Sequence, residues 1–154
     1  MADLLDDGLL SELETIAVEL ARLGGHEIRA ALGKMQEVHY KGIEADPSYF
    51  TDPVSDVDAR VEQIIRERLA QSFPDHDNIG EEMDHRPGRD HDFVWAVDPI
   101  DGTANFINGF PLFASSVGLL YRGSPVVGAL WCSTSHALDG GIYHAIVWRH
   151  LRFN

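Results

Sequence analysis

Residues 95–106 read WAVDPIDGTANF, and this stretch decides both the expected fold and the expected chemistry. The apolar run 93–97 predicts a strand that ends at Asp98, because Pro99 has no N–H for a strand ladder and turns the chain. The carboxylates of Asp98 and Asp101 can then face one pocket. Mg²⁺ prefers a few such oxygen ligands, with waters and substrate phosphate completing its octahedron. The stretch therefore indicates a place for Mg²⁺-assisted phosphate chemistry.

The residues after Asp101 add a possible anion site. Gly102 has no side chain, so the backbone can come close to a ligand there. If residues 103–106 begin a helix, its free N–H groups and its dipole favour an anion. The alternative is structural, since Asp-Pro and Asp-Gly are common turn formers and Asp101 or Thr103 can simply cap a short helix. For a lone D-P-x-D-G motif, this alternative is the commoner one.

A second acidic element changes that balance. Glu81 and Glu82 follow Gly80, and adjacent carboxylates repel each other unless a cation or solvent separates them. Taken alone, the pair is explained equally well as a solvated acidic turn. Together with WAVDPIDGTANF, it indicates a metal site.

The two elements resemble the motifs of the inositol monophosphatase family. A shorter upstream element, Asp52-Pro53-Val54-Ser55 with Asp58, is similar to the family's D-x-V-T-x-x-D pattern, and the resemblance runs from about residue 10 to Ala145. The residues that carry it are Gly80-Glu81-Glu82 and Asp98-Pro99-Ile100-Asp101-Gly102-Thr103, extended by Asn105-Phe106 and Pro111.

The resemblance implies a Mg²⁺-dependent, lithium-sensitive phosphomonoesterase that acts on a small phosphorylated substrate. Inositol monophosphate or a related sugar or polyol phosphate is the implied substrate, and a homodimer the implied assembly. By this resemblance, Mg²⁺ is held by Glu81, Asp98, the Ile100 carbonyl and Asp101. Glu81 and Thr103 would orient and deprotonate the attacking water.

The remaining site residues follow from the same resemblance. Asp101 and the backbone N–H groups of Gly102 and Thr103 would bind the substrate, and Glu82 would tune its neighbours. Asp58 would lie close to the metals and support catalysis. It has a second explanation, because Ser55-x-x-Asp58 is also a capping box for the helix predicted over 57–69, and both explanations can hold together.

Composition suits one soluble domain. The chain has 154 residues, 44% of them hydrophobic, which suits a single domain over 1–154 with a real core. Its formal charge of −13 argues against nucleic acid and anionic membranes as partners. The single cysteine, Cys132, cannot form an internal disulfide, and no apolar run approaches the length of a membrane span, so a cytoplasmic location is expected.

Periodicity predicts an α/β fold. Apolar residues recur at helical spacing over 9–35 and 57–69, while 114–121 and 126–131 form a predicted β-hairpin and 142–148 a further strand. Two helices on an antiparallel sheet make a layered α-β sandwich, as in the N-terminal half of the family. Residues 36–52 are a predicted loop, and the resemblance implies a flap there that carries Lys41.

The sequence departs from the family pattern at its end. The family's later half carries a W-D-x-A-A motif whose aspartate binds metal and substrate, and nothing here corresponds to it. We therefore expect an N-terminal metal-binding portion of the family fold, with exposed apolar surface. Two hypotheses follow: a phosphatase, as a fragment or completed by another molecule, or a truncated non-catalytic relative that binds metal or anion or serves as a protein-interaction module.

Overall fold

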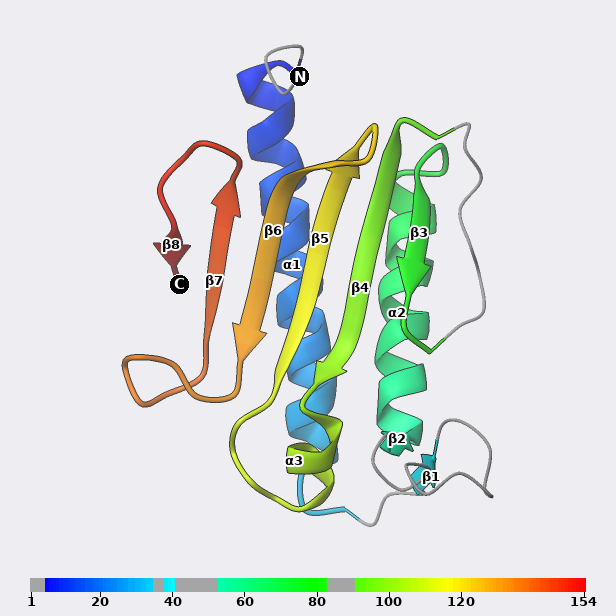
Figure 1. The fold of residues 1–154 in the computed structure, drawn as a ribbon, viewed down its shortest axis with the longest axis vertical. Coiled ribbons are helices and arrows are strands. Elements are labelled where there is room, and N and C mark those ends of the chain that lie inside the picture. Colours follow the sequence, from blue (N-terminus) through cyan, green and yellow to red (C-terminus); the bar gives the residue numbers. More distant parts are fainter. Residues whose placement is uncertain (1–4, 35–37, 41–52, 83–90) are drawn as a thin grey trace.

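The computed structural model describes residues 5–34, 38–40, 53–82 and 91–154 (Figure 1). The predicted loop over 36–52, with Lys41 and Asp52, falls almost entirely outside these ranges. The elements in chain order are α1 (Asp7–Ala31), β1 (Val38–Tyr40), β2 (Pro53–Ser55), α2 (Asp56–Ser72), β3 (Asp77–Gly80), β4 (Phe93–Asp101), α3 (Thr103–Ile107), β5 (Ala114–Tyr121), β6 (Ser124–Cys132), β7 (Gly141–Ile146) and β8 (Arg152–Phe153).

Six strands form one sheet in the order β3-β4-β5-β6-β7-β8. From β4 to β7 each strand pairs antiparallel with the next, as predicted, and β8, which the sequence did not predict, pairs antiparallel with β7. Strand β3 instead pairs in parallel with β4, so the sheet is mixed. The direction of a strand as short as β3 depends on the side from which the chain enters the sheet. The four residues of β3 do not predict this direction.

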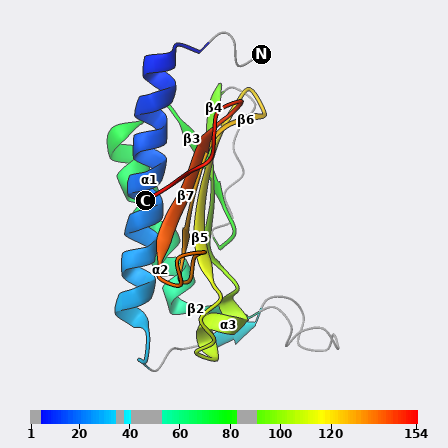
Figure 2. The ribbon, with the colours of Figure 1, turned by 90° about the vertical axis from the view of Figure 1, so that its left-hand side faces the viewer.

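Both long helices lie on the same face of the sheet (Figure 2). Helix α1 packs on β5, β6 and β7, and α2 packs on β4. The strands alternate buried and half-buried residues, which is the period of two expected for a sheet covered on one face. The core between sheet and helices includes the fully buried side chains of Leu13, Leu20, Ile28, Val61, Ile65, Trp95 and Leu119.

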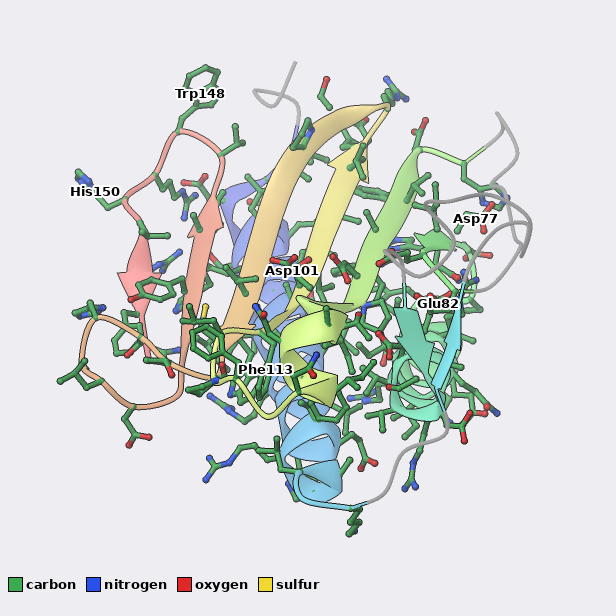
Figure 3. The ribbon with its side chains drawn as sticks, turned by 60° about the horizontal axis from the view of Figure 1, so that its bottom comes forward. Asp77, Glu82, Asp101, Phe113, Trp148 and His150 are labelled. Carbon is green, nitrogen blue, oxygen red and sulfur yellow. The ribbon has the colours of Figure 1, made fainter. Side chains whose placement is uncertain are left out.

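The opposite face of the sheet carries small and apolar residues that remain half-buried in the described part of the chain, among them Val94, Ala96, Gly118, Leu120, Leu130 and Ala145. Large apolar side chains are also exposed elsewhere. Trp148 is 91% exposed and Leu138 is 89% exposed, and Figure 3 shows Trp148 and His150 projecting outward from the turn between β7 and β8. The expectation of exposed apolar surface is therefore confirmed.

Strand β4 differs from its prediction at one point. Its ladder with β5 continues past Pro99 to Asp101, where the predicted strand stopped at Asp98. Proline is tolerated because the register shifts between Asp98 and Asp101, and a bulged residue makes no regular ladder bond. Within the described ranges, no helix is long and apolar enough to cross a membrane.

Candidate active site

The bulge in β4 brings Asp98 and Asp101 to the same side of the sheet. Asp98 lies opposite Ser116 and Asp101 lies opposite Ala114. Since cross-strand partners share a face and Ser116 and Ala114 are two residues apart, both aspartates face the side away from the helices. In a regular strand, residues three apart would point to opposite faces. The predicted pairing of the two carboxylates therefore depends on the bulge.

Thr103 begins the short helix α3, which the sequence left as one possibility, and Thr103 joins two parts of the site. Its hydroxyl oxygen lies 2.9 Å from Asp58 Oδ1 and 2.9 Å from the Ile100 carbonyl oxygen. One hydroxyl has a single proton, so it donates to one of these acceptors at a time. The contact with Asp58 links the start of α2 to the start of α3, although 45 residues separate them.

Asp58 makes the capping contact that its sequence predicted and a second contact with Thr103, while its role in catalysis stays a prediction. Its Oδ2 atom accepts hydrogen bonds from the Ser55 N–H at 2.8 Å and the Ser55 hydroxyl at 2.5 Å. The first of these bonds, together with the backbone N–H of Asp58 donating to the Ser55 hydroxyl oxygen, forms the predicted capping box of α2. Its Oδ1 atom accepts from Thr103. Burial raises the pKa of the Asp58 carboxyl, and the hydrogen bonds from Ser55 and Thr103 partly oppose that shift.

Asp98 has a strongly raised pKa. Burial raises its pKa to about 7, with further contributions from the charge and the hydrogen bond of Glu81 and from the charges of Asp101 and Asp58. Its Oδ1 atom is buried and has no hydrogen-bond partner among the described residues. A buried, unpartnered carboxylate oxygen beside three other acids is costly unless a cation lies next to it.

This donor set fits Mg²⁺. The ion binds through one or two protein carboxylates while waters and phosphate fill its other positions. Asp98 offers an oxygen that has no partner among the residues described by the structure. Within the described ranges, no group of three or more His, Cys, Asp or Glu side chains is arranged to hold a metal ion. Two close carboxylates remain sufficient for Mg²⁺, although not for an ion that needs a full cage of protein ligands.

Gly102 shapes the turn between β4 and α3. Its φ of 86° lies in the left-handed region, and a Cβ there would come within 2.9 Å of the Leu112 carbonyl oxygen. The backbone conformation and the nearby Leu112 carbonyl therefore require glycine at position 102. The sequence had suggested a different reason, the close approach of a ligand. Its predicted substrate contact stays a prediction.

A cavity of about 320 Å³ opens beside this turn, where Figure 3 shows Asp101 at the junction of β4 and α3. Cys132 lines it, and burial, followed by the charge of Asp101, raises the pKa of the Cys132 thiol, which therefore stays protonated near neutral pH. The lining also includes Asp101, Gly102, Asn105, Phe113 and Thr134.

On the other side of the site, Glu81 and Glu82 directly follow β3. Gly80 pairs with Val97, the residue before Asp98, and this register brings Glu81 next to Asp98. The backbone N–H of Glu82 donates to the side chain of Glu62, a buried residue of α2.

The structure thus brings together Asp58, Glu81, Asp98, Asp101 and Thr103, with the Ile100 carbonyl and Glu82 beside them. Their chemical roles remain predictions. The sequence reasoning missed Glu62, for which the only signal was its spacing of four residues from Arg66 on a predicted helix.

Residues 9–154 match the model of the inositol monophosphatase family. A protein named fructose-1,6-bisphosphatase/inositol-1-monophosphatase from Aquifex aeolicus is 40% identical to the chain over 118 residues, which cover 75% of this chain and 42% of that protein.

Solved structures agree with this match. The IMPase of Thermotoga maritima superposes with a TM-score of 0.75 at 27% identity, covering 91% of this chain and 50% of that one. An IMPase/NADP phosphatase complexed with Mg²⁺ and phosphate gives a TM-score of 0.75 at 22% identity, and the match covers 95% of this chain and 52% of that one. The chain therefore spans about half the length of these relatives.

Proposed function

The chain belongs to the inositol monophosphatase family, and from this premise we propose that residues 1–154 form the N-terminal metal-binding portion of a Mg²⁺-dependent phosphomonoesterase. One observation carries the proposal: the bulge in β4 turns Asp98 and Asp101 to one face, beside Glu81, where Asp98 Oδ1 is buried and has no hydrogen-bond partner in the described part of the chain. A solvated turn would not bury an acid in this way.

The groups that would supply ligands to Mg²⁺ are the carboxylates of Glu81, Asp98 and Asp101 and the carbonyl of Ile100, and two of these carboxylates are enough for one ion. When bound, Mg²⁺ lowers the pKa of a coordinated water and neutralises charge on the phosphate. The Ile100 carbonyl has two lone pairs, so its contact with the Thr103 hydroxyl leaves one free for a metal. A fold neighbour complexed with Mg²⁺ and phosphate supports this choice of ion.

Thr103 and Asp58 would handle the proton of the attacking water. When the Thr103 hydroxyl donates to Asp58 Oδ1, its oxygen lone pairs are available to accept a hydrogen bond from water. Asp58 keeps Thr103 in that orientation, and the Ser55 capping box keeps Asp58 in place. Glu81 would share in orienting and deprotonating the water, and Glu82 would tune its neighbours.

The substrate would be a small phosphomonoester such as inositol monophosphate or a related sugar or polyol phosphate. Asp101 and the backbone N–H groups of Gly102 and Thr103 would contact it at the mouth of the 320 Å³ cavity. The overall charge of −13 disfavours nucleic acid and anionic membranes as partners. Lithium sensitivity, a homodimer and a cytoplasmic location complete the proposal.

Replacing Asp101 tests this function directly. Asp101→Asn keeps the size of the side chain but removes its charge, so Mg²⁺-dependent phosphate release should fall by about a hundredfold or more while the fold persists. Phosphate release from inositol monophosphate, with and without Mg²⁺, measures this. Asp92→Asn, at the opposite end of β4, is the control, and its activity should match the parent protein. Equal turnover in Asp101→Asn and the parent would contradict the proposal.

The half-buried apolar face favours a second candidate, a non-catalytic relative that acts as a metal- or anion-binding or protein-interaction module. A solution mass measurement beside the phosphate-release assay separates the two. A folded, inactive oligomer supports the module, and Mg²⁺-dependent turnover supports the enzyme.

A further inference from the structure

Glu62 is completely buried in α2, although it carries a carboxylate. A buried carboxylate is tolerated only where hydrogen bonds or an opposite charge compensate for its lost hydration. It is not one of the carboxylates proposed to hold Mg²⁺, so its burial calls for another explanation.

Its contacts tie α2 to β3 and to the acidic turn that follows. Glu62 Oε1 accepts a hydrogen bond from Arg66 Nε at 2.9 Å, and Arg66 Nη2 lies 2.8 Å from the same oxygen. Glu62 Oε2 accepts the backbone N–H of Glu82 at 2.7 Å. Arg66 Nη1 donates in turn to the side-chain oxygen of Asn78 in β3. Helix α2 thus holds both β3 and the residue after Glu81.

The same carboxylate explains why residue 80 is glycine. A Cβ at Gly80 would lie 2.1 Å from Glu62 Oε1 and 2.2 Å from Glu62 Cδ, far inside contact distance. Gly80 is not among the glycines with positive φ, so its backbone conformation does not itself demand glycine. The Glu62 side chain therefore occupies the space that any larger residue at position 80 would need.

Glu62 thereby controls where Glu81 lies. Gly80 and Glu82 flank Glu81, and both are in direct contact with the Glu62 carboxylate. We propose that Glu62 is a positioning residue for the metal site, which braces the turn Gly80–Glu82 so that Glu81 remains beside Asp98. This inference rests on the proposed function, since it assigns Glu62 a purpose in metal binding rather than in stability alone.

Replacing Glu62 by glutamine tests the brace. Glu62→Gln presents an amide N–H₂ to a place where only acceptors fit, so the turn shifts and the Kd for Mg²⁺, measured by calorimetry, should rise by about tenfold or more. Glu67→Gln, the same change on the exposed side of α2, should leave that Kd unchanged. If folded Glu62→Gln binds Mg²⁺ as tightly as the parent protein, its role is only structural and the proposal is wrong.

A double-mutant cycle tests the glycine argument. Gly80→Ala alone should weaken Mg²⁺ binding, because its methyl group collides with the Glu62 carboxylate. Added to Glu62→Ala, the same change should cost little more, since the obstacle has gone. Purely additive effects on the Kd would overturn the proposal.

A measurement on the parent protein covers the other outcomes. The Glu82 amide donates to a buried acceptor, so NMR should show its hydrogen exchange to be strongly slowed. If the parent protein binds no Mg²⁺, the proposed function fails, while a slowly exchanging Glu82 amide still supports the brace. If the variants do not fold, the exchange rate of the Glu82 amide in the parent protein becomes the test of the brace. Exchange as fast as in an unstructured peptide would then overturn it.

Discussion

The two arms of the acidic site are held in different ways. In the β4 arm, residues 98–103, the main chain sets the geometry through a bulge against β5 and a left-handed Gly102. In the β3 arm, residues 80–82, a buried side chain of α2 sets it through Glu62. The geometry of the β4 arm depends on residues within the arm itself, such as Pro99 and Gly102. The geometry of the β3 arm depends on a side chain from another element, α2. The β4 arm should therefore be sensitive to backbone changes and the β3 arm to changes in α2.

The largest effect should come from breaking the main-chain scaffold. Gly102→Ala forces a Cβ into the left-handed region and against the Leu112 carbonyl, so it should lower the free energy of unfolding by about 3 kcal/mol. Gly109→Ala is the matched control, because Gly109 has a φ of 70° but no atom within 4 Å of a Cβ, and it should cost about 1 kcal/mol. Urea denaturation measures both. Equal losses would show that the Leu112 contact contributes nothing.

Removing the charge of Asp98 should have a smaller effect, and one that depends on pH. The folded-state pKa of about 7 lies above the ordinary value of 3.8, so without metal the folded state holds this proton more tightly than the unfolded state. The stability that protonation of Asp98 contributes is therefore fully present below about pH 4 and is lost as the pH rises through 7. At pH 8, metal-free Asp98→Asn should be more stable than the parent protein by about 2 kcal/mol, after allowance for solvent screening.

Thermal unfolding in a chelator from pH 4 to pH 8 checks this prediction. The advantage of Asp98→Asn should vanish near pH 4, and saturating Mg²⁺ should stabilise the parent protein but not the variant. Asp92→Asn, which removes a carboxylate paired with Arg122 rather than a crowded one, should give no such gain. A gain from Asp98→Asn that is the same at every pH would show that charge is not its cause.

The smallest effect should come from the α2 side. Ser55→Ala removes the side-chain half of the capping box and one hydrogen bond to Asp58, so it should cost about 1 kcal/mol. Ser11→Ala on α1, where the hydroxyl bonds back to the Asp7 carbonyl of the same helix, should change stability by about 0.5 kcal/mol or less. Chemical denaturation of both variants gives the comparison. If Ser11→Ala lowers the free energy of unfolding as much as Ser55→Ala, the capping box adds no stability beyond that of an ordinary helical serine.

Local patterns predicted much of the fold. Helical spacing of apolar residues located α1 and α2, and the β-rich segments 114–121 and 126–131 located the hairpin between β5 and β6, because these signals depend on neighbours in the chain. The parallel pairing of β3 with β4 was not predicted. Nor was the continuation of β4 past Pro99, since a bulge is defined by the register of a partner strand that lies further along the chain.

The residue types of the site were predictable for the same reason. Asp98, Asp101 and Thr103 lie within six residues, and Ser55 and Asp58 follow a local capping pattern, so the sequence alone indicated an acidic, metal-binding turn and its family. Only the tertiary structure decided that Asp98 and Asp101 share a face, that Thr103 reaches Asp58, and that Glu62 holds the turn around Glu81. Those contacts join segments up to 45 residues apart, and their geometry arises only when the helices pack on the sheet.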